Sequence, residues 1–253
     1  MENDKTTAGI SNPISKPPDL LVIKGRVEES AELLKQPVYI ELKKFIRTKE
    51  AATFSFRLPL DNKLNKTIKR CGDILLSTIV IAGVLSWLIP VMTLLIKMDS
   101  RGPVFFFQKR NKKNGEIFTC IKFRSMIENE EADVLQASVN DKRITRLGRF
   151  LRRHYIDELP QFFNVWLGDM AFIGPRPHML SDNTRYEELI EYYDYRHKVK
   201  PGITGLSQVL GYVGETTNIQ RMKDRVKLDI FYVRHWSLML DFKIILHTLL
   251  KFF

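Results

Sequence analysis

One uncharged stretch dominates the hydrophobic pattern of the chain. It runs from Ile74 to Ile96, contains Pro90 and has Lys and Arg residues close to both of its ends. As a helix rising about 1.5 Å per residue it would reach roughly 34 Å, enough to cross a bilayer. A crossing helix should have most of its flanking Lys and Arg on one side, and Pro90 removes a helical hydrogen bond. The pattern therefore predicts a bent, re-entrant helix over 74–96, which enters the membrane and returns to the same face.

After this stretch, apolar and polar residues first alternate and then follow the spacing of a helix. Residues 103–124 alternate around an Asn114-Gly115 turn, which predicts a small β-hairpin. From about Ile144 the spacing is helical and basic, and residues 236–253 form a second amphipathic run, as in helices that lie at a membrane interface. The expected fold class is α+β, mainly helical: a monotopic membrane protein with a Pro-bent re-entrant helix, a small β-hairpin and interfacial amphipathic helices.

Composition and charge narrow the partners. A net charge of +11 indicates an acidic partner, which could be anionic lipid, a phosphorylated substrate or nucleic acid. No nucleic-acid-binding signature is visible, so we expect no nucleic acid partner. Cys71 and Cys120 provide neither a disulfide framework nor a zinc pattern. We expect residues 1–65 to form an extension without a membrane span or signal peptide, its first 20 or so residues disordered, and residues 66–253 to form one domain.

An acidic pair, Asp157 and Glu158, follows a run of arginines at the predicted start of a helix. One interpretation is that the pair only caps the helix, which stabilises it by about 1 kcal/mol. The other is a phosphate site, where one carboxylate holds Mg²⁺ against a diphosphate or attacks phosphorus. If both acids act on one substrate, they must lie at the helix start, because adjacent residues inside a helix do not face one another.

Two further segments have the composition of phosphate or nucleotide loops. Residues 174–177, GPRP, hold Arg176 between two prolines, and residues 196–205, RHKVKPGITG, combine basic residues with a Pro-Gly turn. Each segment could also be an ordinary surface turn.

Together these segments resemble a known family. KRCGD, SRGPVFFFQKR, KFRSM, RLGRFLRRHYIDELPQFFNVWLGDM, FIGPRP, RHKVKPGITGLSQV and LDFKIILHTLL occur in family order from Lys69 to Phe253. The chain is similar in these motifs to the bacterial sugar transferases, the monotopic polyprenyl-phosphate phosphoglycosyl transferases. DELPQ with GDM and GPRP is a very specific combination.

The resemblance implies a two-step reaction at the cytoplasmic face of the bacterial inner membrane. Asp157 would attack the sugar-bearing phosphate of a UDP-sugar, release UMP and form a phosphosugar-aspartyl intermediate, which polyprenyl phosphate would then attack. Glu158 would hold Mg²⁺, and Lys122 and Arg152 would neutralise phosphate charge. The product would begin a surface glycan such as exopolysaccharide, capsule or O-antigen. Residues 66–253 would be the catalytic domain. Further substrate contacts are expected at Arg176, Arg124, Arg196, Thr204, Gln208 and Asp241.

The chain departs from the family pattern at two places. Ile89-Pro90 stands where the family often has Ser-Pro, with Ser86 one turn earlier, and Tyr212 stands where the family often has an arginine. The second change leaves the sugar and nucleotide preference open. Expected partners are a UDP-sugar, polyprenyl phosphate and lipids of the cytoplasmic leaflet, with a homodimer as an open alternative. The rival hypothesis is a non-catalytic membrane-surface scaffold of a glycan assembly complex.

Overall fold

The structure, a computed structural model, describes residues 57–128, 137–138, 141–214 and 218–252. The predicted disorder of the first 20 residues, and most of the predicted extension, lie outside this part. In chain order the elements are η1 (Pro59–Asp61), α3 (Lys63–Val80), η2 (Ile81–Leu85), α4 (Ser86–Asp99), β1 (Phe105–Asn111), η3 (Lys113–Gly115), β2 (Ile117–Phe123), α5 (Arg146–Arg153), η4 (Ile156–Glu158), α6 (Gln161–Leu167), β3 (Ala171–Ile173), α7 (Leu180–Leu189), η5 (Tyr193–Lys198), β4 (Gly202–Thr204), α8 (Leu206–Val209), α9 (Ile219–His235) and α10 (Leu238–Phe252). The expected α+β, mainly helical class is confirmed.

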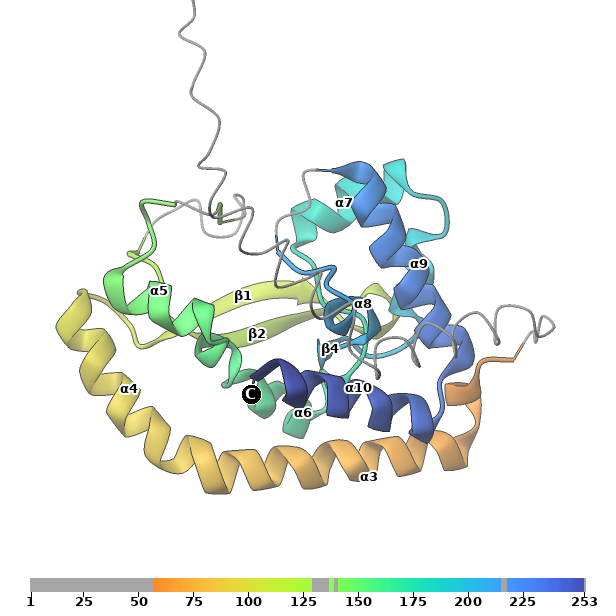
Figure 1. The fold of residues 1–253 in the computed structure, drawn as a ribbon, viewed down its shortest axis with the longest axis horizontal. Helices are drawn as coiled ribbons and strands as arrows, with labels where there is room; N and C mark the ends of the chain where they lie inside the picture. Colours follow the sequence, from red (N-terminus) through yellow and green to blue (C-terminus); the bar gives the residue numbers. More distant parts are fainter. Residues whose placement is uncertain (1–56, 129–136, 139–140, 215–217, 253) are drawn as a thin grey trace, which may run out of the picture.

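The uncharged stretch forms the middle of one long bent helix made of α3, η2 and α4. Figure 1 shows α3 along one edge of the molecule and α4 turning away from its end. The turn η2 is a π-helix and lies just before Pro90. Such a wide turn is a known cause of helix bending. The Ser86 hydroxyl donates to the Ala82 carbonyl at 2.7 Å, and the Trp87 indole donates to the Gly83 carbonyl at 3.0 Å. Side chains thus satisfy backbone groups at the bend.

Both arms of the bent helix pack against the same body. On the α4 side, Leu88 and Ile96 are buried in a core cluster with Leu151 of α5. On the α3 side, the Arg70 guanidinium donates to the carbonyls of Val165 and Trp166 at the end of α6, at 2.6 and 2.7 Å. The two ends of the bent helix are therefore held by neighbouring parts of one domain.

The bent helix also carries much exposed apolar surface. Counted as one helix, Lys63–Asp99 is the only helix in the described part of the chain that is long and apolar enough to cross a membrane. Its neighbours α6 and α10 expose further large apolar side chains. We call this set the apolar face: Leu75, Ile79, Trp87, Leu94, Trp166, Leu167, Phe242 and Leu249.

The predicted hairpin is confirmed as β1 and β2, which pair antiparallel with Arg110 opposite Phe118. At its tip Asn114 has φ 60 and Gly115 has φ 77, the backbone that an Asn-Gly pair tolerates best. A second pair, the parallel strands β3 and β4, was not predicted. There a Cβ on Gly202 would lie 2.1 Å from the backbone nitrogen of Gly174, so only glycine allows the two chains to meet.

Candidate active site

Asp157 and Glu158 lie in η4, a single 3-10 turn between α5 and α6. The Thr145 hydroxyl caps α5 by accepting from the Gly148 N–H at 2.9 Å, and Tyr155, with φ 56, turns the chain out of that helix. The next helix, α6, begins only after this turn and has no side-chain cap. The interpretation of Asp157 as a helix cap is therefore wrong. Both acids are buried, with 6% and 8% of their surface exposed.

Cations from two other segments hold the Glu158 carboxylate. The Lys122 ammonium, on β2, donates to Oε1 at 2.8 Å. The Arg176 guanidinium, in the turn after β3, donates to Oε2 at 2.9 Å and also to Oε1. Burial opposes the charge of Glu158, but Arg176 and Lys122 outweigh it and hold the pKa of Glu158 well below its usual value. Glu158 is therefore an anion clamped by two cations.

Asp157 differs from Glu158 in its hydrogen bonds and in the direction of its pKa shift. Within the described residues no group donates a hydrogen bond to its carboxylate. Burial and the charge of Glu158 raise the pKa of Asp157 to about 6, against the opposing charges of Lys122, Arg152 and Arg176. At neutral pH most Asp157 side chains are therefore ionised, with oxygen lone pairs that no donor among the described residues occupies.

The predicted magnesium ligand, Glu158, is already paired with two cations in this arrangement. Mg²⁺ prefers oxygen ligands and is commonly held by one or two carboxylates together with substrate phosphates. Oε1 of Glu158 accepts from both Lys122 and Arg176, and Oε2 accepts from Arg176, so a metal ion at Glu158 would share the carboxylate with two cations. Among the described residues, the one cluster with ligand spacing for a metal is Glu187, Asp194 and His197, outside the acidic pair.

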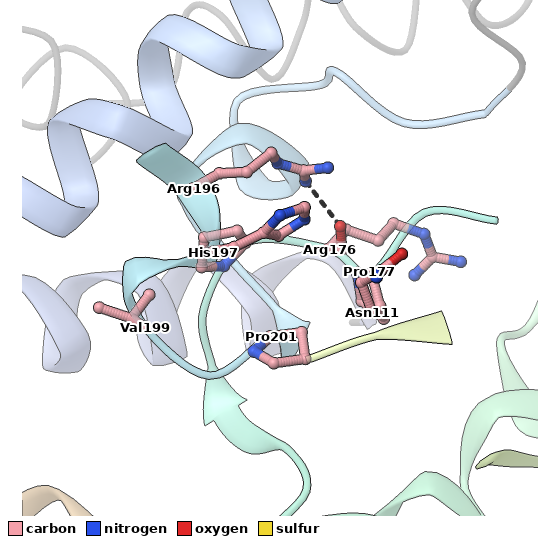
Figure 2. A pocket seen from close by; sticks show the side chains of 8 residues that line it. Asn111, Arg176, Pro177, Arg196, His197, Val199 and Pro201 are labelled. Atoms are coloured by element: carbon pink, nitrogen blue, oxygen red, sulfur yellow. Dashed lines mark hydrogen bonds between the residues drawn. The ribbon is translucent and has the colours of Figure 1, made fainter. Parts of the chain in front are cut away.

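The structure brings together Lys122, Asp157, Glu158 and Arg176, with Arg152 close enough for its charge to act on Asp157. Arg196 contacts this group through the backbone of Arg176. It is 1% exposed, pairs with Asp229 at 2.8 Å and donates to the Arg176 carbonyl at 2.6 Å, the contact drawn in Figure 2. The Arg196 guanidinium thus fixes the turn that carries Arg176.

The other predicted substrate contacts have protein partners elsewhere. Arg124 donates to backbone carbonyls just after α4, at Ser100 (2.7 Å) and Arg101 (2.6 Å). The Thr204 hydroxyl bonds to the Thr248 hydroxyl at 2.9 Å, and the Gln208 amide donates to the Ile203 carbonyl at 3.0 Å. Asp241 accepts from Lys69 and Trp236, both at 2.9 Å, and from Tyr232 at 2.8 Å. Substrate roles for these residues stay predictions.

Sequence reasoning missed one cation next to this group. Arg110, on β1, ends the motif SRGPVFFFQKR and was given no role of its own. Its backbone bridges to Met179, shortly after the GPRP turn. In the hairpin register it points to the same side as Lys122, because both residues lie on alternate positions of paired strands. The alternation of residues 103–124 contained this signal.

Comparison with known proteins identifies the family. The sequence model of the bacterial sugar transferase family matches residues 64–253. This chain belongs to that family. It is 46% identical over 199 residues to the UDP-glucose:undecaprenyl-phosphate glucose-1-phosphate transferase of Klebsiella pneumoniae, an alignment covering 78% of this chain and 42% of the relative.

Two more relatives show the range of the family. The UDP-N-acetylgalactosamine-undecaprenyl-phosphate N-acetylgalactosaminephosphotransferase of Aeromonas hydrophila is 42% identical over 72% of this chain and 43% of its own length. The exopolysaccharide production protein PSS of Rhizobium leguminosarum is 41% identical over 74% of this chain and 96% of its own length. The chain thus spans less than half of the sugar-phosphate transferases named here and nearly all of PSS.

Proposed function

We propose that this protein transfers a sugar-1-phosphate from a UDP-sugar to undecaprenyl phosphate, which begins the assembly of a surface glycan. The observation that carries this proposal is the contrast within the acidic pair. Asp157 is buried, mostly ionised and receives no hydrogen bond from the described residues, whereas Glu158 is clamped by Lys122 and Arg176. The relatives' names include both UDP-glucose and UDP-N-acetylgalactosamine, so the sugar is left open.

In the first step the Asp157 carboxylate attacks the sugar-bearing phosphorus. The bond from this phosphorus to the bridging oxygen breaks, UMP leaves, and an acyl phosphate links Asp157 to the sugar phosphate. In the second step an oxygen of undecaprenyl phosphate attacks the same phosphorus and frees Asp157. Phosphoryl transfer depends mainly on positioning and on neutralising charge. Lys122, Arg152 and Arg176 supply that charge, and no step is assigned to magnesium.

A UMP-release assay tests the proposal. The full chain in lipid nanodiscs would be incubated with single UDP-sugars, with and without undecaprenyl phosphate, and the intact protein mass would report the adduct. We expect UMP release with at least one UDP-sugar and no adduct in Asp157→Asn. As a matched control, Asp169→Asn removes a carboxylate that only pairs with Lys112 at 2.8 Å, and it should leave the adduct intact.

The scaffold hypothesis predicts a different result in the same assay. A scaffold would release no UMP with any UDP-sugar, whatever residue stands at position 157. An adduct retained by Asp157→Asn would instead place the nucleophile on another residue.

We also propose that the bent helix is a re-entrant element at the cytoplasmic face of the inner membrane. Three features support this: both arms pack on one body, the apolar face is exposed, and the Ser86 and Trp87 side chains satisfy carbonyls at the bend. Backbone groups in lipid need such internal partners. With both arms on one body, the two ends of the helix should emerge on the same side.

Cysteine labelling tests this topology. Cys71 is exposed and lies just before the apolar stretch, so it reports one end. Arg101→Cys in a Cys71→Ser background reports the other end. With a membrane-impermeant maleimide on intact spheroplasts, we expect both cysteines to react only after permeabilisation. Reaction of one without permeabilisation would mean that the helix crosses the membrane.

A further inference from the structure

Arg110 is a half-buried cation that has no carboxylate partner among the described residues. Its guanidinium donates to the side-chain oxygen of Gln108 and approaches the Pro177 carbonyl at 3.4 Å. These are neutral acceptors, so its charge is left uncompensated by any direct ion pair. Burial lowers the pKa of Arg110, and the charge of Arg176 acts in the same direction. The carboxylates of Asp182 and Glu158 act on Arg110 without a direct ion pair, so its guanidinium can still pair with an anionic ligand.

The neighbours of Arg110 place it at the edge of the acidic pair. Arg110, the Gln108–Cys120 pair and Lys122 follow one another along the same face of the hairpin. Arg110 is two residues from Gln108 on β1, and Lys122 is two residues beyond Cys120 on β2. The buried Cys120 thiol is acted on by the charges of Lys122, Arg110, Glu158 and Arg176 together. These four charged groups therefore all act on one buried side chain of the hairpin.

A chain of contacts connects Arg110 to the nucleophile. The charges that act most strongly on Asp157 come from Glu158, Lys122, Arg152 and Arg176. Those acting on Arg110 include Arg176 and Glu158. Glu158, the neighbour of Asp157 in η4, is bonded to Arg176 at 2.9 Å, and Arg110 approaches the carbonyl of the next residue, Pro177, at 3.4 Å. Glu158 and Arg176 therefore link Asp157 to Arg110. A substrate whose first phosphate meets Asp157 would bring its second phosphate toward Arg110.

From this geometry we infer that Arg110 binds the phosphate next to the one being transferred, a role that rests on the proposed function. In the first step this is the phosphate that leaves as UMP. An attacking group must approach phosphorus opposite the bond it breaks. In the second step the bond to Asp157 breaks, so the lipid phosphate has to enter where UMP left. Arg110 therefore serves one subsite that UMP and undecaprenyl phosphate occupy in turn.

The test measures binding of UMP and the two half-reactions. Charge-assisted hydrogen bonds of this kind correspond to about a ten- to hundredfold change in affinity. We expect Arg110→Gln to weaken UMP binding by that factor and to raise the KM for both the UDP-sugar and undecaprenyl phosphate. Arg110→Lys should restore part of the loss. Gln108→Glu, which gives Arg110 an internal carboxylate partner, should also weaken UMP binding although Arg110 is retained.

Lys109→Gln is the matched control, because Lys109 is the adjacent residue, exposed, and donates to the Thr119 hydroxyl at 2.9 Å. It removes one positive charge from the opposite face of the strand and should leave UMP binding unchanged. The inference is overturned if Arg110→Gln binds UMP as the wild type does, or if its UMP affinity falls no further than in Lys109→Gln. Failure of the proposed function would appear differently, as a wild-type protein that forms no adduct.

Discussion

Replacing Asp157 by asparagine should stabilise the fold, and the gain should grow as the pH rises from about 4 to above about 6. The reason is the position of the carboxylate, which is buried beside the charge of Glu158 and receives no hydrogen bond from the described residues. Asparagine has the shape of the neutral acid, so it removes the penalty of ionising this group. Replacing a residue that serves catalysis at the expense of stability commonly stabilises the fold in this manner.

The size of the effect follows from the pKa of Asp157, which is raised from 3.8 to about 6. Each pKa unit corresponds to about 1.4 kcal/mol, so the full shift corresponds to about 3 kcal/mol. Because the folded pKa exceeds the unfolded one, the neutral carboxyl contributes its stability at low pH, and that contribution is lost as the pH rises through about 6. The advantage of the variant should be near zero at about pH 4 and about 1–3 kcal/mol at about pH 8.

Thermal melts of the purified protein in detergent, followed by intrinsic fluorescence across this pH range, measure the difference. For a chain of this size, 1 kcal/mol shifts the Tm by about 2–4 °C, so the gain is within reach of the assay. Asp169→Asn serves as the control, since it breaks only a half-exposed pair with Lys112 and should change stability by less than about 1 kcal/mol at any pH. A pH-independent gain, or a less stable Asp157→Asn at alkaline pH, would refute the reasoning.

Three further outcomes are expected. The rate of adduct formation should rise with pH through about 6 as Asp157 ionises, and Glu158→Gln should move this rise to lower pH because a repelling charge is gone. Asp241→Ala should destabilise the fold by about 3–5 kcal/mol, because it leaves the buried Lys69 ammonium unpaired. The KM for UDP-sugar, measured on the folded fraction, should stay unchanged. A raised KM would support the predicted substrate role of Asp241. EDTA should abolish UMP release if the predicted magnesium requirement holds, yet leave the Tm unchanged, since Arg176 and Lys122 already balance Glu158.

The predictable parts of the fold are those that a short stretch of sequence determines by itself. The Asn114-Gly115 turn and the alternation around it specify the hairpin, and the basic amphipathic run specifies α5. Pro90 predicted a bend in the apolar helix, but the irregular turn lies earlier, at Ile81–Leu85. Its exact form, a π-turn satisfied by the Ser86 and Trp87 side chains, depends on which donors reach which carbonyls. Periodicity carries no information on that choice.

The site was predictable as a set of residues and not as an arrangement. The Asp157–Glu158 pair was found from its arginine-rich surroundings, but its place in a separate turn depends on Tyr155 adopting a left-handed backbone, which sequence propensity does not favour. Arg196 was expected at the substrate because its segment, RHKVKPGITG, resembles a family motif. Its true partner, Asp229, lies on α9, and only the tertiary structure brings the two together.

The bent helix and the acidic pair are mechanically one unit. Ile156 and Leu159 flank the acids on either side, and both pack against the same core cluster as Leu85 and Leu88 of the bent helix. Since protein cores are closely packed, the position of Asp157 is fixed relative to the bend. If the bend sits in the membrane, the nucleophile is held at a constant height above the lipid. An undecaprenyl phosphate, whose phosphate also stays at a constant height, would then meet Asp157 without any large movement of the protein.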